Sequence, residues 1–533
     1  MSTGMVVDPG TVTGTGSDPG PRRTRVRAGF VERWLDNPVF VKHVRSRLRR
    51  SQVVPSAAVV VVLCLCALYG GHVTGTLESG GIFGLIVGLQ GVLLAIIGAT
   101  QVASAVGGAR ESGILDFHRV SPSSPASVAL GFFFGAPIRE YLLFALTLPF
   151  ALICVAFGAP TFLGFLQVMA ALLLSAWLVH AVSLFFALAS KKPKSASKAV
   201  VGLMIFLFVF GGQVGVIGVW RVSSLLDASP RVPIFGVPLP WLVSVVLDEG
   251  VVLAFLMIAS CRKMRSDRAH ALSKPEAIAC LGSIGVMVLG GVWSLAGAPF
   301  LTLPYLYALA ALACVMAVTM TPTLGEFAKW ARRAIRSGAA APRLAPWDDL
   351  ALNRVGLVAL GAILLVLATI AWQAVELRVV DDPILPQFRL PVAPDYSRSI
   401  AVAVLSVVGF GLVCQAAHLR YPRRATSLIG LFVFFAWGIP LILGVILSVA
   451  NAGEDTSIVI AALSPVFGIG VASNIRGASD PTPFQAAALI PPLVFALLFN
   501  NLVTSARRRA LRDLHAETPK PLKPGGEADL LLA

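Results

Sequence analysis

The sequence predicts an all-α polytopic membrane protein with about 12 transmembrane helices, and three observations lead to this fold class. Of the 533 residues, 56% are hydrophobic and only 13% are charged, and the mean hydropathy is +0.81. Apolar stretches of roughly 20 residues, enough to cross a bilayer core about 30 Å thick, recur along the whole chain. The segments between them are too short or too polar to bury a soluble core.

Charge and cysteine content indicate the orientation of the chain in the membrane and the role of its cysteines. The 43 Lys and Arg exceed the 27 Asp and Glu by 16, and most of them lie at the ends of apolar stretches. This distribution is typical of helices oriented by the positive-inside rule, so we expect cytoplasmic N and C termini and no nucleic-acid partner. The seven cysteines lie in or beside apolar stretches and form no CxxC pair, which indicates packing residues.

The chain divides into four segments. Residues 1–54 form a cytoplasmic arm, 55–265 a first six-span unit, 266–504 a second six-span unit, and 505–533 a cytoplasmic tail. The first unit has expected spans at 55–72, 81–105, 139–157, 163–189, 199–220 and 240–261. The second has expected spans at 277–295, 302–321, 354–375, 399–418, 427–449 and 484–504. We therefore expect a multi-pass protein of the cytoplasmic (inner) membrane in contact with the lipid bilayer.

One further apolar stretch, 457–475, is interpreted as an outer element that dips into the membrane. Counting it as a span would place the basic cluster that begins at Arg507 outside the cell. Its Ser464-Pro465 and Gly468 also favour a break. The segment from Ser229-Pro230 to Phe235-Gly236 has the same place in the first unit. Two interpretations stay open: two related halves, or chance recurrence of loop residues.

The end of the arm predicts an amphipathic helix on the inner leaflet. Asn37 is a favourable N-cap and Pro38 suits the first helical position. Apolar and basic side chains then fall on opposite faces: Val41, Val44 and Leu48 against Lys42, Arg45 and Arg49. A purely electrostatic anchor to anionic lipids is the simpler interpretation, and the two roles are compatible.

The segment that joins the second and third spans, 107–125, is polar but keeps a short apolar ridge. The ridge consists of Ile114, Leu115, Phe117 and Val120. Pro122 and Pro125 then redirect the chain into the membrane. We expect a short helix at the inner surface that transmits force to the spans, with these candidate contact residues: Arg110, Glu111, Gly113, Ile114, Leu115, Asp116 and Pro122.

Two motifs in the first 140 residues resemble the membrane subunits (permeases) of type-2 ABC transporters. The run Arg110-Glu111-Ser112-Gly113-Ile114-Leu115-Asp116, followed by Ser121-Pro122-Ser123-Ser124 and by Gly131, is similar to their coupling helix. The run Asn37-Pro38-Val39 is similar to the opening that precedes their first span. His43, His118 and Arg119 depart from the pattern of the family.

The resemblance implies how such a chain works. A separate ABC subunit would bind and hydrolyse ATP and dock on the segment Arg110 to Pro122, driving export. Two six-span units are needed, so this chain either pairs with itself or with a second permease, or holds both units. The inner loop 321–333 of the second unit is either a divergent coupling element or a plain connector.

Four charged residues are expected within the membrane, where unpaired charges are costly and often functional. Arg139 and Glu140 lie near the inner end of the third span, and because adjacent helical residues diverge by about 100°, we expect separate partners or water for them. Asp248 and Glu249 are expected to interrupt the sixth span. Each pair either lines a polar conduit or lies at a membrane surface. His180 is expected to be a hydrogen-bonded core residue.

The sequence contains no GxxxxGK[ST] phosphate loop and no HExxH or GxSxG motif, so we expect no enzyme activity, cofactor or metal in this chain. Asp348-Asp349 and Asp381-Asp382 are interpreted as exposed turns. The leading hypothesis is the membrane permease subunit of an ABC transporter. The alternatives are an ion-coupled secondary transporter, which would use Asp248 and Glu249, and a non-transporting membrane scaffold.

Overall fold

The structure, a computed structural model, describes ten segments of the chain: residues 37–76, 80–158, 160–190, 231–267, 269–294, 302–336, 348–379, 396–450, 453–472 and 482–517. They form long helices and a single β-hairpin, as expected for an all-α polytopic membrane protein. The expected fifth span, 199–220, and the Asp381-Asp382 turn lie outside the described residues.

The first unit contains helices α2 (Pro38–Arg47), α3 (Arg50–Thr74), α4 (Gly81–Gly91), the π-helix η2 (Val92–Gly98), α5 (Ala99–Glu111), α6 (Ile114–Val120), α7 (Pro125–Gly135), α8 (Ile138–Ala156), α9 (Phe162–Ala189) and α11 (Trp241–Arg265). Strands β1 (Arg231–Ile234) and β2 (Val237–Pro240) form the hairpin that precedes α11. Helices α4, η2 and α5 are continuous and form one long span, Gly81–Glu111.

The second unit contains helices α12 (Lys274–Ser294), α13 (Thr302–Thr319), α14 (Leu324–Arg336), α15 (Arg354–Val379), α16 (Ser397–Arg420), α17 (Ala425–Phe432), the π-helix η6 (Val433–Gly438), α18 (Ile439–Val449), α19 (Glu454–Ala462), α20 (Pro465–Ala472) and α21 (Thr482–Glu517). Helices α17, η6 and α18 again form one span, Ala425–Val449.

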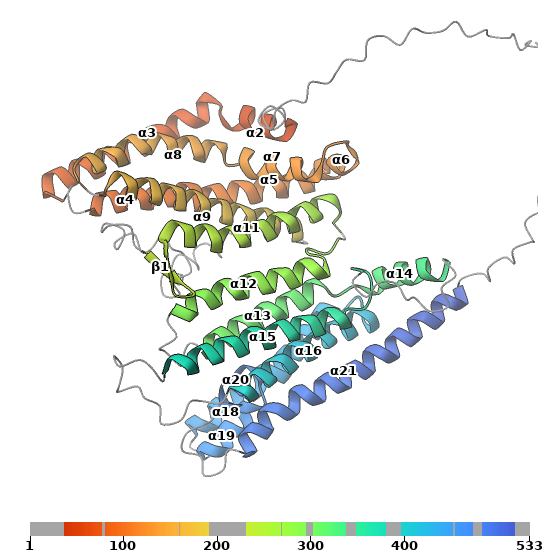
Figure 1. The fold of residues 1–533 in the computed structure, drawn as a ribbon. Coiled ribbons are helices and arrows are strands. Elements are labelled where there is room, and N and C mark those ends of the chain that lie inside the picture. Colours follow the sequence, from red (N-terminus) through yellow and green to blue (C-terminus); the bar gives the residue numbers. More distant parts are fainter. Residues whose placement is uncertain are drawn as a thin grey trace, which may run out of the picture.

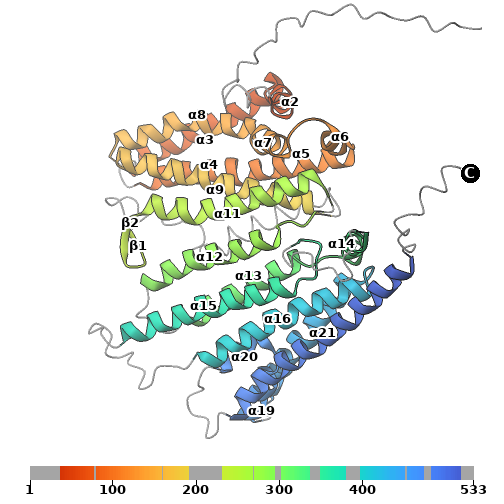
Figure 2. The same cartoon turned by 45° about the vertical axis from the view of Figure 1, so that its right-hand side comes forward.

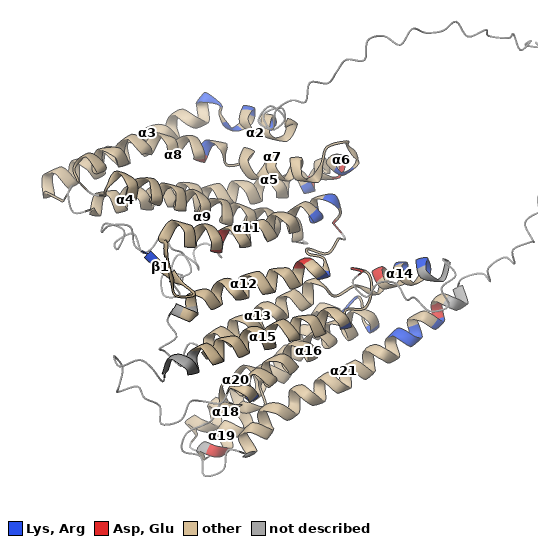
Figure 3. Cartoon of the chain, viewed as in Figure 1, with Lys and Arg blue, Asp and Glu red and all other residues tan. Residues whose placement is uncertain are grey.

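Eleven helices of the described residues are long and apolar enough to cross a membrane. They run side by side from α3 to α21 (Figures 1 and 2). Most of the described Lys and Arg lie at one end of these helices, together with α6 and α14, whereas the hairpin and α19 lie at the other end (Figure 3). The basic end is the one that the positive-inside rule predicts to be cytoplasmic.

Burial differs strongly between the spans. Helix α16 lies at the centre of the second unit, where its neighbours include α13, α15, α20 and α21. Of the residues in its most apolar 18-residue stretch, 78% are buried. In the span Ala425–Val449, by contrast, only 6% of the residues in the corresponding stretch are buried, and this span lies at the edge. Because lipid tails are as apolar as leucine, such an exposed apolar surface is stable only in a bilayer.

The long helices extend beyond the expected spans. Helix α3 begins at Arg50, and α21 continues to Glu517, so the expected tail from 505 starts as helix. With 36 residues, α21 is about 54 Å long, more than a bilayer core requires. Hydrogen bonding along a helix does not stop where the hydrocarbon ends, and Arg, Ala and Leu in 505–511 are good helix formers.

The expected membrane-dipping stretch forms two short helices, α19 and α20, bent by 118° at Leu463-Ser464. Each is about 13 Å long, too short to cross alone. Ser229-Pro230 lies outside the described residues, and the Phe-Gly pairs of the two segments differ in structure. Phe235 and Gly236 form the turn of the hairpin with φ of 51° and 79°, whereas Phe467 and Gly468 are helical.

The two units are joined at their basic end by ionic contacts. Arg262 of α11 donates to Asp349 at 2.6 Å and lies 3.5 Å from Glu276 of α12. Within the second unit, the buried Lys274 Nζ donates to the carbonyl oxygens of Asp348, Ala351 and Leu352. The expectation of an exposed turn at Asp348-Asp349 is therefore wrong for Asp349, which is turned toward these cations.

Candidate functional site

The expected surface helix between the second and third spans is present as α6. Helix α5 ends at Glu111, and Gly113, with a φ of 72°, turns the chain into α6. This left-handed conformation is unfavourable for a residue with a side chain. Ser124 then caps α7 by accepting from the Ser127 N–H, and Pro125 takes the first position of that helix. These turns hold α6 at the basic end of the spans (Figure 3).

Arg110, an expected docking contact, turns its guanidinium into the protein. Its Nη1 donates to the carbonyl oxygens of Ala187 at 2.8 Å and Ser190 at 2.5 Å. Its Nη2 lies 3.3 Å from an Asp267 carboxylate oxygen. A guanidinium at the last carbonyls of α9 satisfies acceptors that the helix itself leaves unpaired. Arg110 thus connects the end of α5 to α9.

Arg119 makes the corresponding contacts from α6. It donates to the carbonyl oxygens of Met264 and Lys263 at the end of α11, and to the carboxylates of Asp116 at 2.7 Å and Asp267 at 3.0 Å. Sequence reasoning missed Asp267, and treated Arg119 only as a departure from a motif. No local pattern signals Asp267, because its partners lie 148 and 157 positions away.

The charge state of Asp267 follows from these contacts. Its partial burial by itself would raise the pKa of the carboxyl. The hydrogen bond from Arg119 and the positive charges of Arg110, Arg119 and Lys263 outweigh this, so the pKa of Asp267 lies below its ordinary value. The carboxylate is therefore ionised at neutral pH and links two arginines from different helices.

The apolar ridge of α6 is divided between an inward and an outward side. Leu115 is fully buried in the core formed by α5, α7 and α9 and packs there. Phe117 and Val120 are 67% and 84% exposed. Glu111, Gly113, Asp116 and Pro122 are exposed, and Ile114 is half-buried. The outward surface of α6 is thus apolar at Phe117 and Val120 and acidic at its N-terminal side.

The N-terminal motif lies against the helix that follows α6. Asn37 caps α2 by accepting from the N–H groups of Val39 and Phe40, as predicted, and Pro38 takes the first position. The Asn37 amide also donates to the Ser127 carbonyl of α7 at 2.6 Å. A Cβ on Gly131 would lie 2.7 Å from the Val39 Cβ, so only glycine permits this approach. The two motifs are distant in sequence but pack against each other in the structure.

The buried face of α2 differs from the expected one. Val39, Phe40 and His43 are buried, whereas Leu48 lies after the end of the helix and is exposed. Lys42 and Arg45 are exposed, as predicted. The centres of the His43 and Phe132 rings lie 5.3 Å apart. Burial, with the nearby charges of Arg47 and Lys42, lowers the pKa of His43 to about 4. The face was mispredicted because α2 packs on α7.

Arg139 and Glu140 pair with each other, so the expectation of separate partners is wrong. The Arg139 Nη2 and Nε lie 2.7 and 3.1 Å from one Glu140 oxygen. A long arginine side chain can bend back over the helix surface, which overcomes the angle between adjacent residues. The Glu140 carboxylate is buried, and its second oxygen has no partner within the described residues.

His180 is a hydrogen-bonded core residue, as predicted. It is fully buried, its Nε2 lies 2.9 Å from the Leu94 carbonyl oxygen, and its Nδ1 lies 3.1 Å from the Tyr141 hydroxyl. Leu94 belongs to the π-helix η2. A π-helix displaces carbonyl oxygens from the regular ladder, and His180 contacts one carbonyl in this segment.

Asp248 and Glu249 do not interrupt the sixth span, because α11 is continuous from Trp241 to Arg265. Carboxylate residues keep the backbone N–H that a helix requires, and Gly250 costs only about 1 kcal/mol. Asp248 is exposed on the surface of α11. Glu249 accepts from the Ser175 hydroxyl of α9 at 2.8 Å, and its second oxygen is buried without a partner in the described part of the chain.

The inner loop of the second unit contains α14, which follows the second span of its unit as α6 does. Thr323 and Glu326 form a capping box: the Glu326 carboxylate accepts from the Thr323 N–H at 2.8 Å, and the Glu326 N–H points to the Thr323 hydroxyl. Phe327 and Trp330 are buried, whereas Lys329 and Arg333 are exposed. The segment is thus an amphipathic helix packed on α21 and α16.

Comparisons with protein-family models, with curated proteins and with solved structures return no match for this chain. Inferences about function therefore depend on the geometry and on the sequence motifs.

Proposed function

We propose that this chain is the membrane subunit of an ABC transporter, and that a separate ATP-binding subunit docks on α6. The observation that carries the proposal is the division of α6 into an outward surface with Phe117 and Val120 and an inward side held by Leu115 and Arg119. Large apolar side chains exposed at the basic end of the helices are typical of a site for another protein.

The contacts of α6 also provide a route for force. Arg119 holds α6 to the end of α11, Arg110 holds the end of α5 to α9, and Asp267 joins the two arginines. A displacement of α6 by a docked subunit would therefore move three spans together. Rigid-body rearrangement of helices is a common way to change the side from which a transport path is open.

Helix α6 leads directly into α7, and α7 is in turn held by α2. Helix α7 follows α6 after four residues, and α2 packs on α7 through Asn37 and Val39. The exposed Lys42 and Arg45 of α2 place positive charge beside α7. Export from the cytoplasmic side, with ATP on the partner, follows from the resemblance and is part of the proposal.

The test is co-purification of the tagged full-length chain in mild detergent, with identification of the chains that accompany it. We expect the wild type to retain an ATP-binding subunit, and the double variant Phe117→Asp, Val120→Asp to lose it. The matched variant Phe117→Leu, Val120→Leu keeps the surface apolar and should retain the partner. Leu115→Ala should lower thermal stability, since a buried leucine contributes about 3 kcal/mol.

The outcomes separate the docking site from the function. Retention of the ATP-binding subunit by the aspartate double variant would disprove α6 as its docking site. Absence of any ATP-binding subunit from the wild type in several detergents would disprove the transporter proposal itself. Loss of the partner in Lys329→Asp, Arg333→Asp would identify α14 as a second docking helix, and hence two permease units in one chain.

An ion-coupled secondary transporter is the second candidate, and Glu249 favours it. A carboxylate with one buried, unpartnered oxygen beside the Ser175 hydroxyl is an arrangement that can bind a proton or Na⁺. The exposed Asp248 is the weaker candidate. This function predicts that Na⁺ or acid raises the thermal stability of the purified protein, that Glu249→Gln removes the effect, and that Asp248→Asn keeps it. A scaffold predicts neither effect, and no ATP-binding partner.

A further inference from the structure

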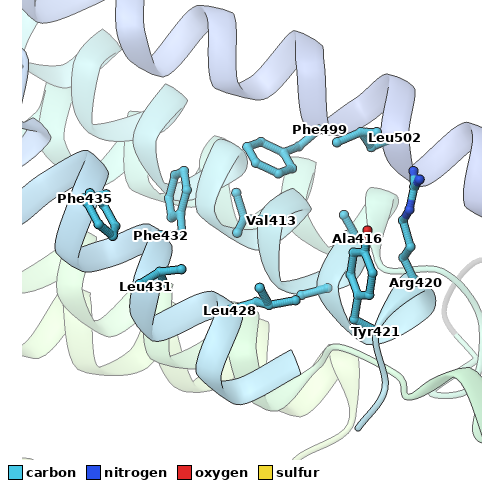
Figure 4. A pocket seen from close by; sticks show the side chains of 11 residues that line it. Val413, Ala416, Arg420, Tyr421, Leu428, Leu431, Phe432, Phe435, Phe499 and Leu502 are labelled. Carbon is cyan, nitrogen blue, oxygen red and sulfur yellow. The ribbon is translucent and has the colours of Figure 1, made fainter. Parts of the chain in front are cut away.

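An apolar groove lies between α16, α17, η6 and α21, away from α6. Its volume is about 360 Å³, within the range of ligand pockets. Val413 lies at its floor, Leu428 and Phe432 at one side, and Phe499 at the other, while Arg420 and Tyr421 lie at one end (Figure 4). Apart from these last two, every side chain that lines the groove is apolar.

The surroundings of the groove are lipid-facing. The span Ala425–Val449, which supplies Leu428, Phe432 and Phe435, is the least buried of the eleven. Leu431 and Phe435, which also line the groove, are 52% and 55% exposed. The ring of Phe432 packs edge-on against Phe499 at 5.6 Å and keeps the two walls together. The groove is therefore open to the hydrocarbon of the bilayer.

The mouth of the groove is positively charged. Arg420, the last residue of α16, lines this end of the groove, and Arg423 and Arg424 follow in the turn that leads to α17. All three are exposed, and none of them forms an ion pair within the described residues. The Arg420 guanidinium lies 5.7 Å from the centre of the Tyr421 ring. It also borders a second pocket, of about 190 Å³, with Arg509 and Asp513.

We propose that the groove binds one anionic phospholipid, with an acyl chain between α16, α17 and α21 and the phosphate at Arg420, Arg423 and Arg424. An acyl chain matches the apolar walls, and the charge at the mouth is complementary to an anionic headgroup. The lipid belongs to the leaflet at the basic end of the helices. A bound lipid would fill the groove and connect the edge span Ala425–Val449 to the buried helix α16.

The experiment is native mass spectrometry of the delipidated full-length chain with equal amounts of dioleoylphosphatidylglycerol and dioleoylphosphatidylcholine. We expect the anionic lipid to bind at least tenfold better. Because each surface arginine contributes roughly fivefold to such binding, Arg420→Gln, Arg424→Gln should weaken it by about 25-fold. The matched variant Arg508→Gln, Arg512→Gln removes two exposed charges of the same end and should change it less than twofold.

A second pair of variants tests the acyl chain. Leu428→Trp fills the groove and should reduce binding of the anionic lipid at least fivefold, whereas Leu443→Trp, exposed on α18 outside the groove, should not. The proposal is overturned by equal binding of the two lipids, by equal loss in both arginine variants, or by wild-type binding in Leu428→Trp. A second copy of the chain, bound in place of lipid and lost in Leu428→Trp, would also overturn it. No outcome depends on an ATP-binding partner.

Discussion

Gly131 of α7 lies directly against Asn37 and Val39 of the arm. The Cβ of an alanine would lie 2.7 Å from the Val39 Cβ and 3.0 Å from the Asn37 Oδ1. The Val39 Cβ is fixed to its backbone, and the Asn37 side chain is held by its hydrogen bonds to Val39, Phe40 and Ser127, so the helices must separate. We expect Gly131→Ala to destabilise the protein by about 1–3 kcal/mol, measured by thermal unfolding in detergent.

The control for this prediction is Gly108→Ala at the same end of the molecule. A Cβ there has no heavy atom within 4 Å, so alanine should be neutral or stabilise α5 by up to about 1 kcal/mol. If Gly131→Ala has the same stability as Gly108→Ala, the close packing of α2 on α7 is not important for stability.

His43 makes the docking of α2 dependent on pH. Its pKa is about 4 in the folded protein, below the ordinary value of 6.5, because it is buried beside Arg47 and Lys42. Protonation therefore favours the state in which His43 is exposed. The stabilisation is complete above pH 6.5 and is lost as the pH falls toward 4. By pH 5.5 the wild type should lose about 1 kcal/mol relative to neutral pH.

The measurement is the thermal unfolding midpoint between pH 7.5 and 4.5 for the wild type and for His43→Gln. Glutamine does not titrate, so the variant should show a smaller decrease over this range. Parallel curves would contradict a buried, neutral His43. His118, whose pKa is also lowered by burial and by Lys42, is unchanged in both proteins and contributes equally.

Helix α14 owes its N-terminus to the capping box of Thr323 and Glu326. Thr323→Ala removes the side-chain hydroxyl, which lies 2.8 Å from Glu326 Oε2 and 3.4 Å from the Glu326 N–H, and should cost about 1 kcal/mol of local stability. Hydrogen exchange of the amides in 324–328 should become faster, while that of α16 stays unchanged. Thr323→Ser keeps the hydroxyl and should exchange like the wild type.

At the scale of elements, α6 and α2 differ in how far sequence patterns determined them. The existence of α6 followed from its apolar ridge and from Pro122 and Pro125 after it, since turn chemistry is local. The orientation of its side chains did not, because the ends of α9 and α11 supply the acceptors for Arg110 and Arg119. The N-cap of α2 was likewise predictable, and its buried face was not.

At the scale of the whole molecule, the arrangement of charges predicts which side each loop faces. In a cysteine-free background, Ser112→Cys, next to α6, should be protected from a membrane-impermeant maleimide in intact cells, and Thr76→Cys, after α3, should be labelled. Both residues are exposed and lie at opposite ends of the same unit. The reverse pattern would invert the proposed orientation and would place α6 outside the reach of a cytoplasmic ATP-binding subunit.

The same labelling experiment resolves the topology of α19 and α20. If the bent pair dips into the membrane and returns, Thr456→Cys in the first turn of α19 and Pro483→Cys in the first turn of α21 should both be labelled from outside. Both residues are exposed. If only Thr456→Cys is labelled, the pair crosses the membrane as a broken span, and the basic end of α21 then lies on the opposite side from α6.

The sequence by itself determined the fold class, the positions of eleven spans, the break at Ser464-Pro465, the capped start of α2 and the presence of α6. These features depend on local hydrogen bonding and on the cost of leaving backbone groups unpaired in lipid, which act on each segment separately. Only the tertiary structure decided that Asp267 joins Arg110 to Arg119, that Glu140 pairs with Arg139, and that Glu249 accepts from Ser175. Apart from the adjacent pair, these contacts join side chains more than 70 positions apart, and local periodicity carries no information about such distances.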